Sequence, residues 1–368
     1  GVHGGGAVLS AAVVPGGGAA PVAPVAPTLP DCLDSASFYV HSGTPLALET
    51  RRSRLFSGAV TPASLLFVRN NLPLPSADIV RAPDAWVLDV SGVGRPGGIS
   101  LATLKGLGRD TVTAVLQCSG NGRAFFEHGP SGSQWSVGAA GCVVWTGVLL
   151  STVVAHLGGS VDGMKYVPAT GGEILPQDVD PLDVVVERSI PIDKGMRDCL
   201  LAWEMNGQPV PITHGGPLRL IVPGYFGCNQ IKYVRAVSLT KDQSRAKIQR
   251  KGYRFRPVGE KGDPGQPSLW RMPVKSWVNG PGADGEPVLA GSVQFHGVAF
   301  SGERGISAVE VSLDGGQPWS AAELYGPDMG PSAWRSFRYS ATLPAGEATV
   351  VSRATDTSGD VQPRRRVE

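Results

Sequence analysis

The sharpest local feature in this sequence of 368 residues is a cysteine at the end of an apolar run. Residues 111–117 are typical of a strand, and Cys118 follows directly, ahead of a loop of Ser, Gly and Asn that ends at Arg123. Gly-rich loops after strands let the backbone approach a ligand closely. A guanidinium five residues away would lower the pKa of the thiol and favour a nucleophile or a soft-metal ligand. A buried structural cysteine before an ordinary turn is the alternative interpretation.

Several familiar catalytic patterns are missing from the sequence. His128, His156 and His214 are the candidate bases for a Cys–His pair, but none has a diagnostic spacing. The short Cys/His spacings that zinc requires are absent, as are a CxxCH haem attachment, a GxGxxG fingerprint and a P-loop. The cysteine loop therefore has to be judged on its own residues.

A second group of cationic or protonatable residues lies further along the chain. His214 and Arg219 enclose a Gly-Gly-Pro turn, and Lys232 follows after a further Pro-Gly turn. Side-chain cations and backbone amides next to such turns suit a phosphorylated ligand. Ordinary exposed charge at strand ends explains the same pattern.

The elements that must position these residues are short. With 50 Gly and 31 Pro, the composition argues against long helical bundles and favours turns, strands and loops. Lys plus Arg number 33 and Asp plus Glu 31, so the net charge of +2 gives no broad basic field for nucleic acid. The least charged stretch, residues 129–161, is broken by Gly and Pro, so we expect no membrane span.

Three regions follow from the residue pattern. Residues 1–30 contain small residues, Val and Pro, and we expect a flexible tail or the remnant of an export signal, which suggests a periplasmic protein. Residues 31–256 mix strands with short helices at 100–107 and 148–157, so we expect an α+β domain. Residues 257–368 begin with a Gly/Pro-rich connector and continue as an antiparallel β-sandwich pattern.

The strands predicted in the α+β domain and in the sandwich lie at residues 64–68, 86–90, 111–117, 141–145, 184–186, 200–205, 218–222, 233–240, 274–278, 292–300, 308–313, 335–340 and 349–354.

Several motifs, which follow one another along the chain as they do in that family, resemble those of the sulfite oxidase family of molybdenum enzymes. The resemblance runs from about Leu55 to Pro363. Its segments are LQCSGNGR at 116–123, FVRNN at 67–71, AWEMNGQPVP at 202–211, HGGPLR at 214–219, VPG at 222–224 and VEVSLDGGQPW at 309–319. The last is similar to the signature of the family's C-terminal Ig-like domain. We therefore expect a mixed α/β molybdopterin-binding domain followed by an Ig-like β-sandwich that serves dimer or subunit contacts.

The resemblance implies a role for each matching residue. Cys118 would bind molybdenum through its thiolate, beside the dithiolene of molybdopterin. Arg69, Arg123 and Tyr253 match positions of the substrate pocket, and Trp135 would line it. The residues implied for cofactor binding are Asn71, Ser189, His214, Arg219 and Lys232.

The sequence departs from the family pattern in two places. Asn71 stands where the family usually has His, and an amide cannot take up a proton near neutral pH. Asn229 and Gln230 stand where animal members often carry Arg and His, which suggests a bacterial type of cofactor anchor.

The implied activity is molybdenum-dependent oxidation of sulfite to sulfate by oxo transfer. Since no haem motif occurs in this chain, the electrons would pass singly to a separate cytochrome c or haem subunit, with a homodimer or heterodimer as the assembly. A sulfane dehydrogenase and a nitrate reductase use the same scaffold and stay open as alternatives. A secreted binding protein without enzymatic activity is the alternative from another class.

Overall fold

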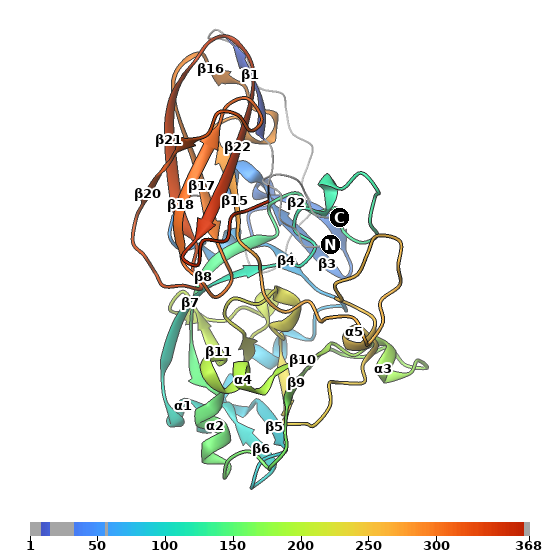
Figure 1. Cartoon of the computed structure of the whole chain (residues 1–368). Coiled ribbons are helices and arrows are strands. Elements are labelled where there is room, and N and C mark those ends of the chain that lie inside the picture. Colours follow the sequence, from blue (N-terminus) through green and yellow to red (C-terminus); the bar gives the residue numbers. More distant parts are fainter. Residues whose placement is uncertain (1–8, 15–32, 56–57, 364–368) are drawn as a thin grey trace.

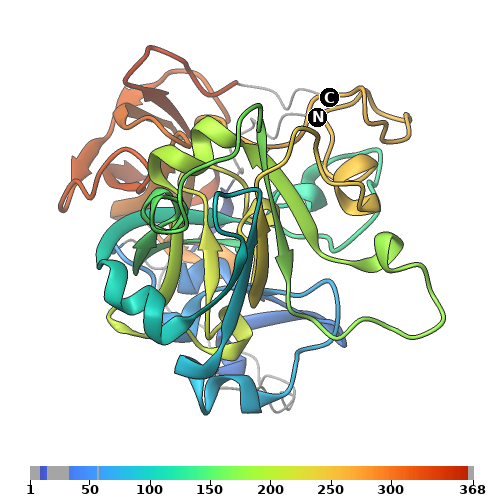
Figure 2. The same ribbon diagram turned by 90° about the horizontal axis from the view of Figure 1, so that it is seen from below.

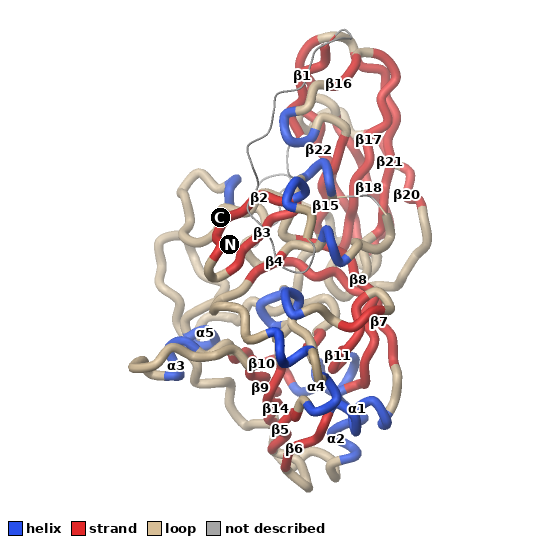
Figure 3. Tube along the Cα trace, turned by 180° about the vertical axis from the view of Figure 1, so that it is seen from behind, coloured by secondary structure: helices blue, strands red, loops and turns tan. Residues whose placement is uncertain are grey.

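The computed structural model describes residues 9–14, 33–55 and 58–363, which form two stacked bodies (Figure 1). Strands far outnumber helices, and the helices are all short (Figure 3). The upper body in Figure 1 is a β-sandwich and the lower body is a mixed α/β domain. The predicted fold class is confirmed.

The α/β domain is built on three sheets with the strand orders β10-β9-β14-β5-β6, β12-β11-β8-β7 (with β13 beside β11) and β2-β3-β4. Helices α1 and α2 lie on one side of this domain and α3 and α5 on the other (Figure 2). Its strands are β2 Phe38–Gly43, β3 Leu46–Thr50, β4 Val68–Arg69, β5 Val87–Ser91, β6 Gly97–Ser100, β7 Asp110–Gln117, β8 Ala140–Leu149, β9 Tyr166–Gly171, β10 Glu187–Pro191, β11 Leu200–Met205, β12 Gln208–Pro209, β13 Arg219–Ile221 and β14 Val234–Ser238. Its helices are α1 Leu101–Leu107, α2 Leu150–His156, α3 Pro181–Val184, α4 Ile192–Asp198 and α5 Lys247–Arg250.

The sandwich packs a sheet of order β16-β1-β22-β18-β19 against one of order β15-β17-β21-β20. Inward-facing apolar side chains alternate along its strands, as the sequence pattern predicts. Its strands are β1 Leu9–Val14, β15 Lys275–Gly280, β16 Val288–Leu289, β17 Gly291–Phe300, β18 Ile306–Ser312, β19 Ser320–Ala321, β20 Glu323–Tyr325, β21 Arg335–Leu343 and β22 Gly346–Asp356.

Three predicted elements are corrected by the structure. Part of the expected flexible tail, Leu9–Val14, is strand β1, which pairs antiparallel with β22; the rest of residues 1–30 lies outside the described residues. The predicted strand at 64–68 is a 3-10 turn over Ala63–Leu65, and only Val68–Arg69 pair as β4. The predicted strand at 184–186 is not formed: Val184 is the last residue of α3, and residues 185–186 connect α3 to β10. In each case pairing with a distant segment, or its absence, decides the outcome.

The two bodies share a hydrophobic core. Val115 and Phe226 of the α/β domain pack in one cluster with Trp277, Phe300 and Trp334 of the sandwich. The backbone joins them as well, since the amide of Val115 in β7 donates to the carbonyl of Ser332 over 2.8 Å. Strand β7, which leads to Cys118, is therefore fixed by both bodies.

Candidate active site

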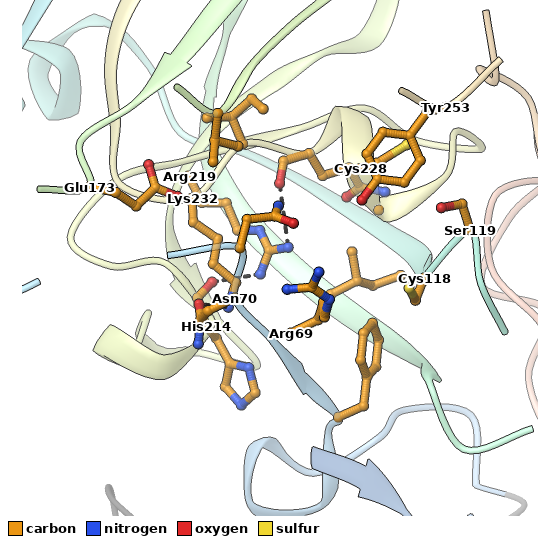
Figure 4. Close-up of a pocket in the computed structure, with 17 residues that line it drawn as sticks. Arg69, Asn70, Cys118, Ser119, Glu173, His214, Arg219, Cys228, Lys232 and Tyr253 are labelled. Atoms are coloured by element: carbon orange, nitrogen blue, oxygen red, sulfur yellow. Dashed lines mark hydrogen bonds between the residues drawn. The ribbon is translucent and has the colours of Figure 1, made fainter. Parts of the chain in front are cut away.

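Cys118 lies immediately after β7 at the wall of a cavity (Figure 4). Its amide donates to the carbonyl of Ala139 at 2.9 Å, and the amide of Gly120 donates to its Sγ at 3.5 Å. These bonds fix the thiol at the cavity wall.

The pKa of the Cys118 thiol is raised on balance: Arg123 lowers it, as predicted, but burial outweighs this effect. Burial raises this pKa most, while the Gly120 amide, Arg69 and Arg123 lower it. The alternative of a structural cysteine is not what the structure shows, because Cys118 lines the cavity. Since a bound soft metal ion would deprotonate the thiol outright, the protein's own charges are not required to do so.

The predicted cationic group gathers on the other side of the same cavity from Cys118, with Arg69 between the two in Figure 4. His214 lies in a 3-10 turn over Ile212–His214, and Arg219 begins β13. Arg219 donates from Nη1 to the carbonyl of His214 at 2.5 Å. Lys232 donates from Nζ to Asn70 Oδ1 at 2.9 Å and to the carbonyl of Thr213 at 2.6 Å. His214, Arg219 and Lys232 thus form one side of the cavity, which we call the basic wall.

This basic wall carries more positive charge than its surroundings balance. Burial and the neighbouring cations lower the pKa of His214 to about 3 and the pKa of Lys232 well below its usual range. Burial lowers the pKa of Arg219 to about 10, and its Nε is buried without a hydrogen-bond partner among the described residues. Glu173 is the one carboxylate that lines the described cavity. An anionic group would satisfy Arg219 and raise the pKa of Lys232 back toward its usual range.

The donors present fit a cofactor with a phosphate at one end and a soft metal at the other. The basic wall provides the anion site and Cys118 provides a thiolate. No group of three His, Cys, Asp or Glu side chains suited to a metal ion occurs within residues 9–14, 33–55 and 58–363. A metal at Cys118 would therefore take its other ligands from the cofactor or from solvent.

The residues implied for the substrate pocket lie in two connected cavities. Arg69 and Tyr253 line the cavity of Cys118, whereas Arg123 lines a wider neighbouring one. Ser119 and Tyr253 line both, so they mark the junction. Arg123 donates to the carbonyl of Ser133 at 2.8 Å, which holds its guanidinium in place.

Tyr253 keeps its phenolic proton. Burial and the nearby thiols of Cys228 and Cys118 raise its pKa to about 12. A neutral phenol is both a hydrogen-bond donor and an acceptor. Tyr253 can therefore donate to an anion in the cavity throughout the physiological pH range.

Two implied site residues are placed elsewhere. Trp135 is fully buried behind the cavity, with its ring centroid 6.4 Å from that of Phe67, so it supports the wall and does not line it. Ser189 lies in β10, where its Oγ accepts from the amide of Ser244 at 2.8 Å and its own amide donates to Gln249 at 3.1 Å. Neither side chain lines the cavity, because Trp135 is buried in the core and Ser189 is hydrogen-bonded to Ser244 and Gln249. Asn71 lines the rim of the cavity and is exposed.

The structure adds residues that sequence reasoning missed. Asn70, Glu173 and Cys228 line the cavity; Asn70 lies within the FVRNN segment but was given no role, and Glu173 and Cys228 lie outside the quoted motifs. Glu49 is 2% exposed and accepts hydrogen bonds from the amides of Ser136 (2.8 Å) and Gly138 (3.0 Å). It thereby fixes the segment that faces the cysteine loop. Such roles arise from contacts between segments far apart in the chain.

Comparisons with known domains agree with this site. Residues 71–248 match the oxidoreductase molybdopterin binding domain, and residues 266–368 match the Mo-co oxidoreductase dimerisation domain. The fold and the site thus define a molybdopterin-binding oxidoreductase.

Relatives define the family more closely. The chain is 36% identical to mitochondrial sulfite oxidase of Homo sapiens (88% of this chain, 61% of that protein) and 34% identical to sulfite oxidase of Gallus gallus (92% and 77%). It therefore spans about three fifths of the human protein. The crystal structure of the sulfane dehydrogenase SoxCD from Paracoccus pantotrophus matches with a TM-score of 0.73 at 27% identity, covering 88% of this chain and 79% of that one. The chain belongs to the sulfite oxidase family.

Proposed function

We propose that this protein oxidises sulfite to sulfate. The observation that carries the proposal is the cluster of Arg69, Arg123 and Tyr253 around the two cavities that meet beside Cys118. Two guanidiniums and a neutral phenol suit a doubly charged oxyanion. The reaction balances as sulfite plus water giving sulfate, two protons and two electrons.

A bound molybdenum cofactor would supply the two-electron redox centre and the oxygen-atom exchange. The chain would hold it with the Cys118 thiolate and, at the phosphate, with His214, Arg219 and Lys232. Arg69 would orient the oxyanion from the side of the basic wall. Tyr253 would donate a hydrogen bond to a substrate oxygen, since its proton is retained.

The wider cavity would form the approach to the site. Its cationic lining residues are Arg123, Lys251, Arg254 and Arg256, and Glu260 is the one carboxylate among its described lining residues. A concave surface with one dominant sign of charge raises the local concentration of oppositely charged ligands. This approach favours anionic substrates as a class.

A sulfane dehydrogenase is the second candidate. Two observations favour it: the structural match to SoxCD and an outer cavity that is wider than the cavity of Cys118. A nitrate reductase would use the same anionic pocket in the opposite redox direction. A binding protein without redox activity would hold no molybdenum.

We also propose that a separate cytochrome c or haem subunit accepts the electrons one at a time, in a homodimer or heterodimer formed through the sandwich. The match to a dimerisation domain over residues 266–368 supports the contact. A periplasmic location is proposed on the sequence of residues 1–30. None of the helices in the described part of the chain is long and apolar enough to cross a membrane.

The test is anaerobic reduction of the molybdenum-loaded protein by sulfite, followed at the metal centre, with thiosulfate and nitrate in parallel. We expect stoichiometric reduction by sulfite, and steady-state turnover with cytochrome c. The Cys118→Ser variant should retain pterin and lose turnover, whereas Cys199→Ser, at a buried thiol that lines neither cavity, should retain both. A sulfite rate no better than background would reject sulfite as the substrate.

A further inference from the structure

Arg188 is a fully buried cation behind the active-site cavity. It lies in β10 and is 1% exposed. Its Nε and Nη2 donate to Asn229 Oδ1 at 3.3 and 3.2 Å, and its Nη1 donates to the carbonyl of Ile248 at 3.0 Å. These acceptors are neutral, and no carboxylate of the described residues forms an ion pair with it. These hydrogen bonds hold the guanidinium in place, but they do not neutralise its positive charge.

An unneutralised buried charge is costly, so its position needs a cause. Burial lowers the pKa of Arg188, while the thiol of Cys228 and the phenol of Tyr253 raise it. An arginine stays protonated under these conditions. Both groups that act on it line the cavity, so its positive charge lies behind the catalytic wall.

Tyr253 is a cavity residue whose ring lies next to this charge. The Arg188 guanidinium carbon lies 5.5 Å from the centroid of the Tyr253 ring, within the range of a cation–π contact. The Tyr253 backbone has a φ of 49°, a left-handed conformation that is strained for a bulky residue. Within the described residues its hydroxyl makes no hydrogen bond, so the ring is oriented by packing: against the apolar cluster that contains Phe226 and Leu269, and against Arg188.

We propose that Arg188 is a positioning residue that orients the Tyr253 phenol toward the cavity and strengthens anion binding there. The proposal rests on the proposed function, because it gives Tyr253 a role at the substrate. Arg188 itself does not line the cavity, so it acts through Tyr253. Asn229 and Ile248, from two other segments, hold it in place.

The test compares Arg188→Gln and Arg188→Lys, each alone and combined with Tyr253→Phe, in molybdenum-loaded protein. Rates are expressed per bound molybdenum, so that incomplete loading does not count. We expect Arg188→Gln to lower kcat/KM for sulfite about 10- to 100-fold, the range found for residues that support metal-site ligands. In the Tyr253→Phe background the same change should cost less than about twofold, because the hydroxyl being positioned is gone.

A second readout needs no turnover. Calorimetric titration of the oxidised protein with sulfate should show weaker binding in Arg188→Gln, and partial recovery in Arg188→Lys, which keeps the charge. Arg353→Gln is the matched control, since Arg353 lies 4.4 Å from the Trp319 ring centroid in the sandwich, and it should change neither readout. Unchanged sulfate affinity in Arg188→Gln, or an equal loss of kcat/KM in both backgrounds, would overturn the proposal. Failure of the wild-type protein to react with sulfite would reject the proposed function instead, because sulfate affinity is still measurable.

Discussion

Lys275, in the first strand of sheet β15-β17-β21-β20, donates from Nζ to the carbonyl of Asn121 at 3.0 Å. Asn121 belongs to the loop that carries Cys118, and Lys275 is 3% exposed. A buried cation of the sandwich, Lys275, is therefore hydrogen-bonded to the cysteine loop. The second body thus supports the site.

The first prediction follows from this contact. Lys275→Met should lower the free energy of unfolding by about 1 to 3 kcal/mol, because it leaves the buried Asn121 carbonyl without its charged donor. It should also speed loss of molybdenum from the loaded protein. Denaturant unfolding and metal analysis after dialysis measure the two effects. Lys241→Met, at an exposed lysine, is the control, and equal behaviour of the two variants would contradict the prediction.

The second prediction concerns the basic wall. In protein made without cofactor, inorganic phosphate at about 10 mM should raise the melting temperature, because only the folded state assembles Arg219 and Lys232 around an anion. Lys232→Met should abolish this shift. The variant should also be the more stable protein in the absence of phosphate, since it removes a buried cation whose pKa burial lowers. A phosphate effect that survives Lys232→Met would place the anion elsewhere.

The third prediction concerns Glu173 and pH. Burial raises the pKa of this carboxyl from 4.5 to about 7. The folded protein therefore holds the proton to a higher pH than the unfolded chain, and this group costs stability increasingly as the pH rises from 4.5 to 7. Glu173→Gln should remove that cost and gain about 1 to 3 kcal/mol relative to wild type at a pH of about 8, with little difference at a pH of about 4.5. Urea unfolding of both cofactor-free proteins at the two pH values measures this stability difference. A difference that does not depend on pH would contradict the raised pKa of Glu173.

The fourth prediction concerns Asn71 at the cavity rim. Asn71→His would place an exposed imidazole there, with a pKa of about 6.5. Below that pH the added positive charge should lower KM for sulfite about two- to fivefold, while kcat changes less. Steady-state assays across the pH range measure the effect. The neutral variant Asn71→Gln should leave the pH profile of KM as it is in the wild type, and a shared profile for both variants would refute a charge effect.

The sequence alone determined the features that depend on neighbouring residues. An apolar run ending in Cys118 forms β7 and presents the thiol, and residues 200–205 form β11 as predicted. Alternating residues such as Val309 and Val311 face the sandwich core. These patterns are local, because the side-chain period of a strand and the preference of Gly for turns are properties of a few adjacent residues.

The tertiary structure decided what depends on burial and on partners from distant segments. Only the fold brings Glu173 and Asn70 to Lys232, sets Arg188 behind Tyr253 and lays Leu9–Val14 beside β22. It also removed Trp135 and Ser189 from the cavity. It reversed the expected direction of the Cys118 pKa, because desolvation outweighs two nearby guanidiniums. Desolvation depends on every atom packed around a group, and no sequence spacing encodes that.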